Sequence, residues 1–337
     1  MREIAVLREV RGKCRGIVEL YDIAVSSQEG VYLVFEYCRH DLSRLINNHY
    51  KVYKKSPFTP PQAKRLFLEL LAALKHMHER NLLHRDLKMS NLLYDERGQL
   101  KVCDFGLARR ALLRSNKLTK IETVRRPSER AVITKQRGAK RRACKGSSLR
   151  SSLVVLRAVI VLTSNSLHQQ QQKMTPNVVS MWYRPPELLL GSEFYGESID
   201  IWGAGCIFSE FFNGQPLFRG KTELDQWELI RSFKGCVKRG EWAKGEQLPK
   251  VVNGGGSASK FEYFEMKIGG ALSIGSPSTT SKTVSRIANL TNTGRCLLDF
   301  CLEYNPQSRC TASTASEHQF FKDEPLATRP ERMPVFP

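Results

Sequence analysis

The chain has 337 residues, of which 41% are hydrophobic and 26% are charged, and its formal net charge is +20. This suits a globular protein with one large domain or two ordinary ones. Its nine cysteines form no CxxC pair, and no run of 18 apolar residues occurs, so a disulfide framework, a zinc site and a membrane span are not expected.

The positive charge is concentrated in one segment. Residues 111–173 contain fifteen Lys or Arg against two Glu, a net charge of +13, which leaves only +7 for the rest of the chain. The segment lacks interleaved aromatic residues, so the pattern favours a solvated basic loop, and nucleic acid is not an expected partner.

The first elements are predicted from hydrophobic spacing. Apolar residues recur at three-residue intervals over Met1–Val10, which predicts a helix. Ile17–Val25 and Val31–Tyr37 are rich in β-branched and aromatic residues around a turn, which predicts two strands. An apolar helix pattern follows Asp41, and a buried helical stripe runs over Pro60–Glu79.

In the next part of the chain, segments with predicted secondary structure alternate with segments of low complexity. Two short strands are expected at Leu92–Tyr94 and Leu100–Cys103, around the turn DERGQ. From residue 111 the basic segment interrupts this pattern, and order resumes at Met174. A helical region is predicted from Pro186 through Phe212.

Glycine, serine and threonine then dominate residues 253–288, as in flexible linkers. A helix is expected over residues 293–304, and a tail follows at 326–337. His76 and His78, near the end of the helix predicted over 60–79, are interpreted as helix-end residues rather than metal ligands.

The most informative residues are His84, Arg85, Asp86 and Asn91 in the run HRDLKMSN, followed by Asp104 in DFG thirteen residues after Asn91. Transfer of a γ-phosphoryl group needs a carboxylate that orients the attacking hydroxyl, and an amide and a second carboxylate that hold Mg²⁺. Asp86, Asn91 and Asp104 supply these groups in that order. Both motifs together, with apolar strand residues between them, indicate this chemistry strongly.

These runs resemble the eukaryotic protein kinases, and specifically the cyclin-dependent kinases. The resemblance covers about two thirds of the chain and includes, in the order of the family, HRDLKMSNLL, DFGLAR, TPNVVSMWYRPPELLLG, SIDIWGAGCIFSE, GQPLFRGKTELDQ and YNPQSR. The chain looks nearest to the transcription-associated PISSLRE and PITSLRE branch.

The resemblance implies an α+β, protein kinase-like fold. Residues 1–37 would be a remnant of an incomplete small β lobe, and residues 38–110 and 174–325 a mainly α-helical large lobe. It also implies a cyclin-dependent Ser/Thr kinase that uses ATP and Mg²⁺, acts on Ser/Thr-Pro sites, binds a cyclin and resides in the nucleus or the cytoplasm.

The resemblance also implies roles for individual residues around the nucleotide. Asp86 would accept the proton of the substrate hydroxyl, Lys88 would lie beside the transferring phosphoryl group, and Asn91 and Asp104 would hold Mg²⁺. The residues expected to contact adenosine each have a core alternative: Phe35 as gatekeeper, Glu36 and Cys38 in the hinge, Asp41 at the ribose and Leu93 as the floor.

Further positions would regulate or brace the site. Thr175 matches the activating phosphosite, and three arginines would gather around its phosphate: Arg2, Arg85 and Arg109. Val179 and Arg184 resemble the pair that shapes a proline pocket, and Ser180 would keep a hydroxyl near Asp86. Structural roles are implied for four more residues: Glu3 as the ion-pairing glutamate of the first helix, Asp200 as a brace for the HRD loop, and Glu187 with Arg309 as a buried ion pair.

The chain also departs from the family. It begins at the helix that contacts cyclin, with no glycine-rich loop and no strand lysine upstream of Glu3, and residues 111–173 lengthen the activation segment. One hypothesis is therefore an imperfect gene model of a full-length kinase. The alternative is a catalytically inactive, kinase-like module that binds a cyclin or substrates.

Overall fold

The computed structural model describes residues 2–10, 12–26, 30–111, 178–237, 241–252, 287 and 289–337. All of them belong to one compact unit, which comprises residues 1–113 and 171–337. Some predictions lie outside the described residues: Thr175, nearly all of the basic segment 111–173, and nearly all of the low-complexity segment 253–288.

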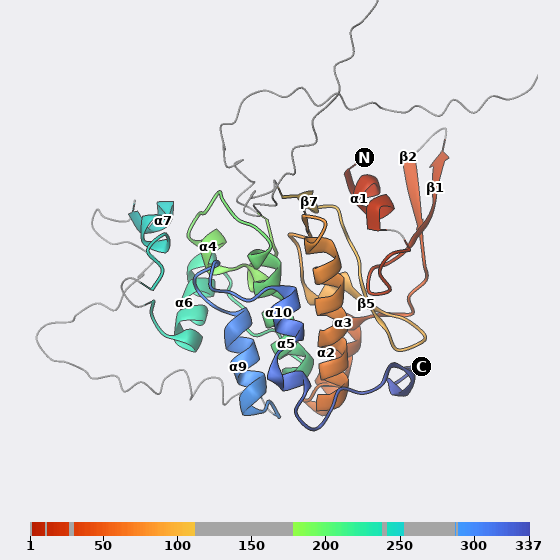
Figure 1. The fold of residues 1–337 in the computed structure, drawn as a ribbon. Coiled ribbons are helices and arrows are strands. Elements are labelled where there is room, and N and C mark those ends of the chain that lie inside the picture. The colour runs from red at the N-terminus through yellow and green to blue at the C-terminus, as the bar shows by residue number, and fades with distance from the viewer. Residues whose placement is uncertain are drawn as a thin grey trace, which may run out of the picture. The chain divides into compact units, whose positions relative to one another are not determined.

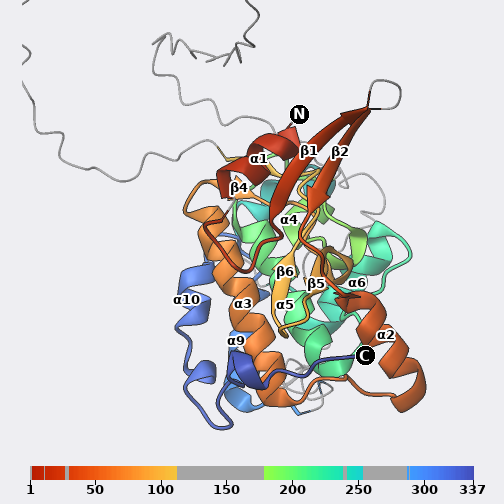
Figure 2. The ribbon, with the colours of Figure 1, turned by 90° about the vertical axis from the view of Figure 1, so that its right-hand side faces the viewer.

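The first element is α1 (Arg2–Val10), which lies near the hairpin of the first two strands (Figures 1 and 2). Its apolar residues recur every three or four positions, so they form one face that packs into the core. The buried residues of this face are Val6, Leu7 and Val10. The helix predicted from this spacing is confirmed.

The hairpin consists of β1 (Leu20–Ser26) and β2 (Gly30–Phe35), which pair antiparallel. The predicted first strand, Ile17–Val25, begins three residues too early. Ile17 instead forms a parallel bridge with Val102, which lies in another sheet. The residues before β1 are therefore held by the larger part of the fold rather than by the hairpin.

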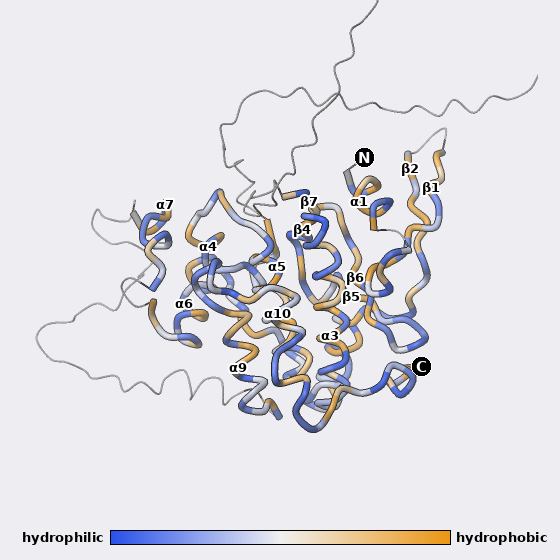
Figure 3. The backbone as a smooth tube through the Cα atoms, viewed as in Figure 1, coloured by the Kyte–Doolittle hydropathy of each residue, from blue (hydrophilic) through white to orange (hydrophobic). Residues whose placement is uncertain are grey.

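Hydrophobic residues lie along both strands of the hairpin (Figure 3). Several remain exposed, among them Val25 at 75% and Val31 at 57%. Exposed apolar side chains on a two-stranded sheet contribute little to stability, because they are not removed from water. In the described residues, the small β lobe consists of this hairpin and α1.

Two helices follow the hairpin. α2 (Leu42–Tyr53) begins where the Asp41 side chain accepts a hydrogen bond from the backbone N–H of Arg44 at 3.1 Å. α3 (Pro60–His78) begins with two prolines, whose missing N–H groups cost nothing in a first turn. The helix predicted over residues 60–79 is confirmed, and it buries one continuous face.

Five short strands form two small antiparallel sheets: β3 (His40–Asp41), β5 (Leu92–Tyr94) and β6 (Leu100–Val102) in one, with β5 in the middle, and β4 (Leu82–Leu83) and β7 (Arg109–Arg110) in the other. The two strands predicted around the DERGQ turn are confirmed. The backbone N–H of Cys103 donates to the carbonyl of Asn91 at 3.0 Å. This contact brings the HRD and DFG loops together.

The rest of the described chain is mainly helical: α4 (Pro186–Leu189), α5 (Ser198–Asn213), α6 (Glu223–Lys234), α7 (Pro249–Val252), α9 (Asn292–Cys301) and α10 (Ala312–Ser316), with 3-10 turns η1 (Met89–Asn91), η2 (Met181–Tyr183), η3 (Gly245–Gln247), η4 (Gln319–Phe321) and η5 (Pro330–Arg332).

The structure refines two of the helical predictions. The helical region predicted from Pro186 through Phe212 contains two helices, α4 and α5, and residues 190–197 between them are not helical. Gly191 has a φ of +88°, a left-handed conformation that commonly ends a helix. The helix predicted over 293–304 ends at Cys301.

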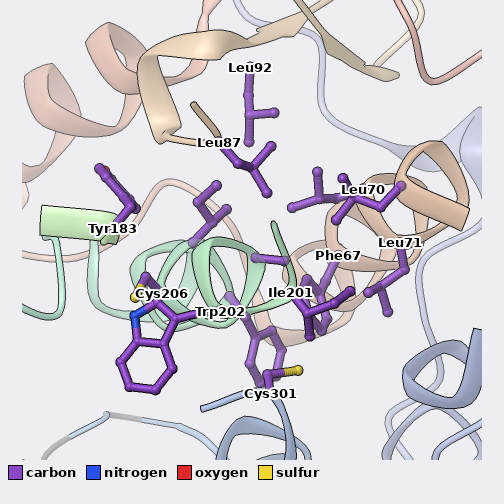
Figure 4. Packing of buried hydrophobic residues seen from close by; sticks show 14 of the residues in the cluster. Phe67, Leu70, Leu71, Leu87, Leu92, Tyr183, Ile201, Trp202, Cys206 and Cys301 are labelled. Carbon is purple, nitrogen blue, oxygen red and sulfur yellow. The ribbon is translucent and has the colours of Figure 1, made fainter. Parts of the chain in front are cut away.

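α5 is the centre of the core, and its residues 199–212 are buried on every side. Figure 4 shows Ile201 and Trp202 of this helix among residues of α3 and α9. Leu87 of the HRD loop packs directly on α5, since a Cβ placed at Gly203 would lie 3.3 Å from the Leu87 backbone oxygen. The loop that carries the candidate chemistry therefore rests on the most buried helix.

The C-terminal residues bind back onto α3 and β5. Arg65 Nε donates to the carbonyl of Thr328 at 2.6 Å, and the Tyr94 hydroxyl donates to the carbonyl of Pro334 at 2.6 Å. The Phe336 ring lies 5.8 Å from the Tyr94 ring. The tail at 326–337 is thus anchored by side chains of the large lobe.

Candidate functional site

The HRD loop is fixed by one buried carboxylate of α5. Asp200 accepts hydrogen bonds from the backbone N–H groups of His84 and Arg85, both at 2.9 Å. His78 Nε2 lies 3.0 Å from the same carboxylate. Arg85 has a φ of +66°, a strained conformation for a residue with a side chain, and these bonds offset the strain.

The ionised form of Asp200 is stabilised by its partners. Burial by itself would raise the pKa of this carboxyl, but the hydrogen bond and charge of His78, together with His84 and the Arg85 N–H, lower it. The sequence indicates only a helix-end role for His78. The contact with Asp200, across 122 positions of sequence, could not be read from helix spacing.

Asp86 is the point where four groups converge. Lys88 Nζ donates to its Oδ2 at 2.6 Å, and the backbone N–H and hydroxyl of Ser180 donate to its Oδ1 at 3.1 and 2.9 Å. Asn91 Nδ2 donates to the Asp86 carbonyl at 2.9 Å. The hydroxyl expected near Asp86 from Ser180 is present.

These contacts set the charge of Asp86. Burial would raise its pKa, but hydrogen bonds from Lys88 and Ser180 and the charge of Lys88 lower it below the usual range. Asp86 is therefore a carboxylate at neutral pH. A carboxylate accepts hydrogen bonds only, so it can orient a hydroxyl and receive its proton.

The DFG turn lies against the HRD loop. The His84 ring lies 5.3 Å from the Phe105 ring, and His84 Nε2 lies 3.0 Å from the Cys103 carbonyl oxygen. Phe105 is fully buried, whereas Asp104 is exposed and has a φ of +62°. Burial of the phenyl ring thus anchors the turn that presents the Asp104 carboxylate.

Asn91 and Asp104 carry side-chain oxygens that could hold a magnesium ion. Asn91 uses its amide nitrogen to bond Asp86, which leaves its oxygen to act as a ligand. Asp104 Oδ1 accepts only a long bond, 3.3 Å, from the backbone N–H of Gly106. Amide and carboxylate oxygens are the protein ligands that Mg²⁺ prefers.

The residues expected around adenosine lie on strands of two sheets and on the connection between β2 and β3, which carries Glu36 and Cys38. Phe35 ends β2, where it pairs with Leu20, and Asp41 in β3 pairs with Leu93 in β5. Phe35 and Leu93 are only partly buried. Asp41 also caps α2, so one of its oxygens is already in use.

Glu36 has a partner that the sequence did not predict. Its carboxylate lies 2.9 and 3.0 Å from Lys101 Nζ and accepts a hydrogen bond from the Glu19 N–H at 2.8 Å. The signal in the sequence is the lysine inside the apolar strand LKV, directly before the DFG turn. The Glu36 backbone N–H donates to the Glu19 carbonyl at 2.9 Å. The Glu36 carbonyl and the Cys38 backbone, rather than the Glu36 side chain, could therefore recognise a ligand.

Two cysteines flank these residues. Burial, followed by the charge of Glu36, raises the pKa of Cys38 to about 11. Burial, followed by the charge of Asp104, raises the pKa of Cys103 to about 12. Both are thiols at neutral pH and therefore weak nucleophiles.

One arginine of the expected phosphate site contacts Tyr195, and a second acts on it through its charge. Arg85 Nη1 donates to the Tyr195 hydroxyl at 3.1 Å, and Arg85 Nε donates to the carbonyl of Leu107 at 2.7 Å. Burial raises the pKa of Tyr195, while the charges of Arg85 and Arg109 act to lower it. Thr175 and the side chain of Arg2 are outside the described part of the chain.

The expected proline pocket has an unusual backbone at Val179. Its φ is +67°, although a β-branched residue rarely adopts this conformation. Arg184 donates to the Val179 carbonyl from Nε at 3.2 Å and from Nη2 at 3.0 Å. Arg184 is held in turn by Glu223, whose Oε1 lies 2.7 Å from Nη1.

A buried hydrogen bond lies beneath η2. The Tyr183 hydroxyl donates to Glu210 Oε2 at 2.8 Å, and both residues are buried. Burial raises the pKa of Glu210 to about 7. This pair was not predicted from the sequence.

Ion pairs were expected at two places, and the described residues form only one of them. Arg309 and Glu187 form a two-point ion pair, with nitrogen–oxygen distances of 2.9 and 3.0 Å, and both side chains are almost fully buried. Glu3 is half-buried on α1, and within the described residues no ion pair to it is formed. Within the described residues, the structure therefore supplies the brace of the large lobe but no ionic partner for Glu3.

A comparison with protein families agrees with these features. Residues 1–127 and 163–321 match the family model of the protein kinase domain. The chain is 32% identical to the serine/threonine-protein kinase ppk23 of Schizosaccharomyces pombe, over the whole chain and 65% of that protein. It is 31% identical to human cyclin-dependent kinase 10, over the whole chain and 71% of that protein.

Solved structures are similar as well. The yeast RNA Pol II CTD kinase CTDK-1 complex contains a chain with 27% identity and a TM-score of 0.66, matched over 97% of this chain and 82% of that one. The CAK complex of Chaetomium thermophilum bound to ATP-gamma-S contains one with 26% identity and a TM-score of 0.70, matched over 100% and 80%.

Proposed function

This chain belongs to the protein kinase family, in its cyclin-dependent branch of serine/threonine kinases, and from this premise we propose that it transfers the γ-phosphate of ATP to a serine or threonine followed by proline. The observation that carries the proposal is the arrangement around Asp86. An ionised carboxylate, a lysine ammonium and an amide converge there within hydrogen-bonding distance.

The Ser180 hydroxyl supports the role of Asp86. It donates to Asp86 Oδ1 at 2.9 Å, which is the contact that a substrate hydroxyl would make before losing its proton. Lys88 neutralises the other carboxylate oxygen and lies where negative charge would build up on the transferring group. ATP would bind between the hinge and Leu93.

Asn91 and Asp104 would hold Mg²⁺, which would neutralise charge on the triphosphate. The residues of the chain do the rest. Asp200 holds the HRD backbone, and the buried Phe105 anchors the turn that presents Asp104.

The preference for proline follows from hydrogen bonding at Val179. Its carbonyl already accepts two bonds from Arg184, so it does not accept one from the backbone of a substrate. A substrate residue with an N–H group would leave that donor unpaired on binding, at a cost of about 1–3 kcal/mol. Proline has no N–H group and avoids the cost.

A cyclin is the proposed activating partner, bound through α1. The described face of this helix includes exposed Ala5 and Arg8, while the opposite face packs into the core.

None of the helices in the described ranges is long and apolar enough to cross a membrane. Residence in the nucleus or the cytoplasm is part of the proposal, and imaging of a tagged chain tests it.

The decisive experiment measures phosphate transfer by the purified chain with a panel of cyclins, ATP and Mg²⁺. Matched peptides carry Ser-Pro or Ser-Ala. Transfer to the Ser-Pro peptide should exceed that to the Ser-Ala peptide, and Asp86→Asn should lower the rate by about 10²- to 10⁴-fold. Equal transfer to both peptides would overturn the assignment of the proline pocket.

A second arm addresses the alternative of a noncatalytic module. The same assay is repeated after a glycine-rich loop and a lysine-bearing strand are fused upstream of residue 1. Transfer only by the fused chain identifies a kinase large lobe that needs those elements. Cyclin binding without transfer in either form would support the binding module.

A further inference from the structure

A cavity of about 350 Å³ lies beside Asp86, since Lys88 and Ser180 both line it and both donate to the Asp86 carboxylate. Three segments form it: the first turn of α2, the HRD loop and η2. We refer to it as the serine-lined cavity. Its lining residues are Ser43, Lys88, Ser90, Ser180, Met181, Trp182 and Tyr183.

The polar groups of the cavity are mainly donors. Ser43 Oγ accepts a bond from Asn47 Nδ2 at 3.3 Å, so its own proton is free to be donated. Ser90 is exposed, and its hydroxyl bonds no other described residue. Lys88 uses one of its three N–H groups on Asp86 and keeps two.

The lining of the cavity carries no negative charge, because none of the residues that line it is acidic. The Asp86 carboxylate, which bonds two of the lining residues, is already occupied by Lys88 on Oδ2 and by Ser180 on Oδ1. The first turn of α2 adds the positive end of a helix dipole, which favours negative charge.

We infer that the serine-lined cavity binds an anionic side chain, a carboxylate or a phosphate, that flanks the phosphoacceptor of the protein substrate. A carboxylate or a phosphate can accept hydrogen bonds from the lining hydroxyls and from Lys88. A lysine or arginine side chain would be repelled by the Lys88 ammonium and by the positive end of the α2 dipole. The exposed Trp182 and the neighbouring Met181 form an apolar wall against the stem of that side chain.

The position of the cavity limits which substrate residue reaches it. Ser180 both bonds Asp86 and lines the cavity. An extended chain advances about 3.3–3.6 Å per residue, so the anionic residue lies within a few positions of the phosphoacceptor. The inference rests on the proposed function for its substrate, but binding of a peptide tests it separately.

The test uses fluorescent peptides with one Ser-Pro site and a single flanking residue that is Asp, phosphoserine, Ala or Arg, placed in turn at each of three positions on either side. Affinity is measured by anisotropy with the full chain and its cyclin. At one position, the Asp or phosphoserine peptide should bind about tenfold more tightly than the Ala peptide, and the Arg peptide no better than Ala.

Substitutions of the residues that line the cavity test whether its charge, rather than its shape, determines peptide binding. Ser43→Glu and Ser90→Glu place a carboxylate in the cavity, so each should abolish the preference for the anionic peptide and favour the Arg peptide. Ser43→Ala and Ser90→Ala remove a donor and should weaken the preference only in part. Ser313→Glu adds the same charge on α10, outside the cavity lining, and should leave the preference unchanged.

Each outcome tests either the anion-binding cavity or the proposed kinase activity. Equal affinity for the four peptides at every position overturns the inference, even where Ser-Pro peptides are phosphorylated. Anionic preference without phosphate transfer keeps the inference and removes the proposed function. A preference for phosphoserine alone identifies a phosphate as the ligand, whereas equal preference for Asp shows that charge suffices.

Discussion

The buried ion pair between Arg309 and Glu187 gives the sharpest test of the large lobe. Arg309 donates to both oxygens of Glu187 and also to the carbonyls of Ser198 and Glu303. The Arg309 side chain is 0% exposed and that of Glu187 is 3% exposed. Arg309→Met keeps the length of the side chain but leaves the Glu187 carboxylate buried without a counter-charge.

Removing one partner of such a pair destabilises by about 3–5 kcal/mol. For a domain of this size a change of 1 kcal/mol shifts Tm by roughly 2–4 °C, so the variant should unfold about 6–20 °C below the parent chain. Thermal unfolding measures the shift in Tm and urea unfolding measures the free energy, both followed by tryptophan fluorescence. Trp202 is a suitable reporter, because the Arg309 guanidinium lies 5.1 Å from its ring.

A matched control and a double variant complete the design. Arg44→Met removes an arginine that is 87% exposed and 3.9 Å from Asp41, and it should change the free energy of unfolding by less than about 1 kcal/mol. Arg309→Met combined with Glu187→Gln should be less destabilised than the sum of the two single variants. If Arg309→Met unfolds within about 1 kcal/mol of the parent, the pair does not brace this lobe.

Three further predictions concern the tail, a buried acid and the metal site. Tyr94→Phe removes the bond to the Pro334 carbonyl and should cost about 1 kcal/mol in urea unfolding, with faster proteolysis of the tail; unchanged cleavage would contradict the anchoring. Burial raises the pKa of Glu210 to about 7, so this carboxyl keeps its proton in the folded state at pH values where the unfolded chain has already lost it. The contribution of this proton to the free energy of unfolding is fully present below the pKa of an ordinary glutamate, and it is lost as the pH rises to about 7. Glu210→Gln should therefore reduce the fall in unfolding free energy over that interval, and an unaltered pH profile would contradict this. Asp104→Asn should raise the Mg²⁺ concentration needed to tighten binding of a fluorescent ATP analogue, while Mg²⁺-free binding stays the same; an unshifted Mg²⁺ titration would count against Asp104 as a ligand.

Local elements of the fold followed the sequence closely. The stripe of α3 and the strands around the DERGQ turn depend on spacing and turn residues within a few positions, so the pattern alone predicts them. The pattern predicted a helical region from Pro186 through Phe212 but not its division into α4 and α5, which are separated by residues that include Gly191 with a positive φ. The first strand failed because Ile17 had a partner outside the hairpin.

In the candidate site, too, some features could be predicted from the sequence and others could not. The residue types and the spacing of Asp86, Asn91 and Asp104 already indicated phosphoryl-transfer chemistry, because that chemistry needs those groups in one order. The pairing of Glu36 with Lys101 was not predicted, although it decides that the hinge carboxylate is already bound.

The amino-acid sequence by itself determined the family, the type of reaction and the residues that could perform it. Only the tertiary structure decided which charges are neutralised and which donors stay free: His78 on Asp200, Ser180 on Asp86, and the hydroxyls of the serine-lined cavity. The reason is physical. Motifs and periodicity act over a few residues, whereas these contacts join positions about one hundred residues apart, and only packing around α5 brings them within hydrogen-bonding distance.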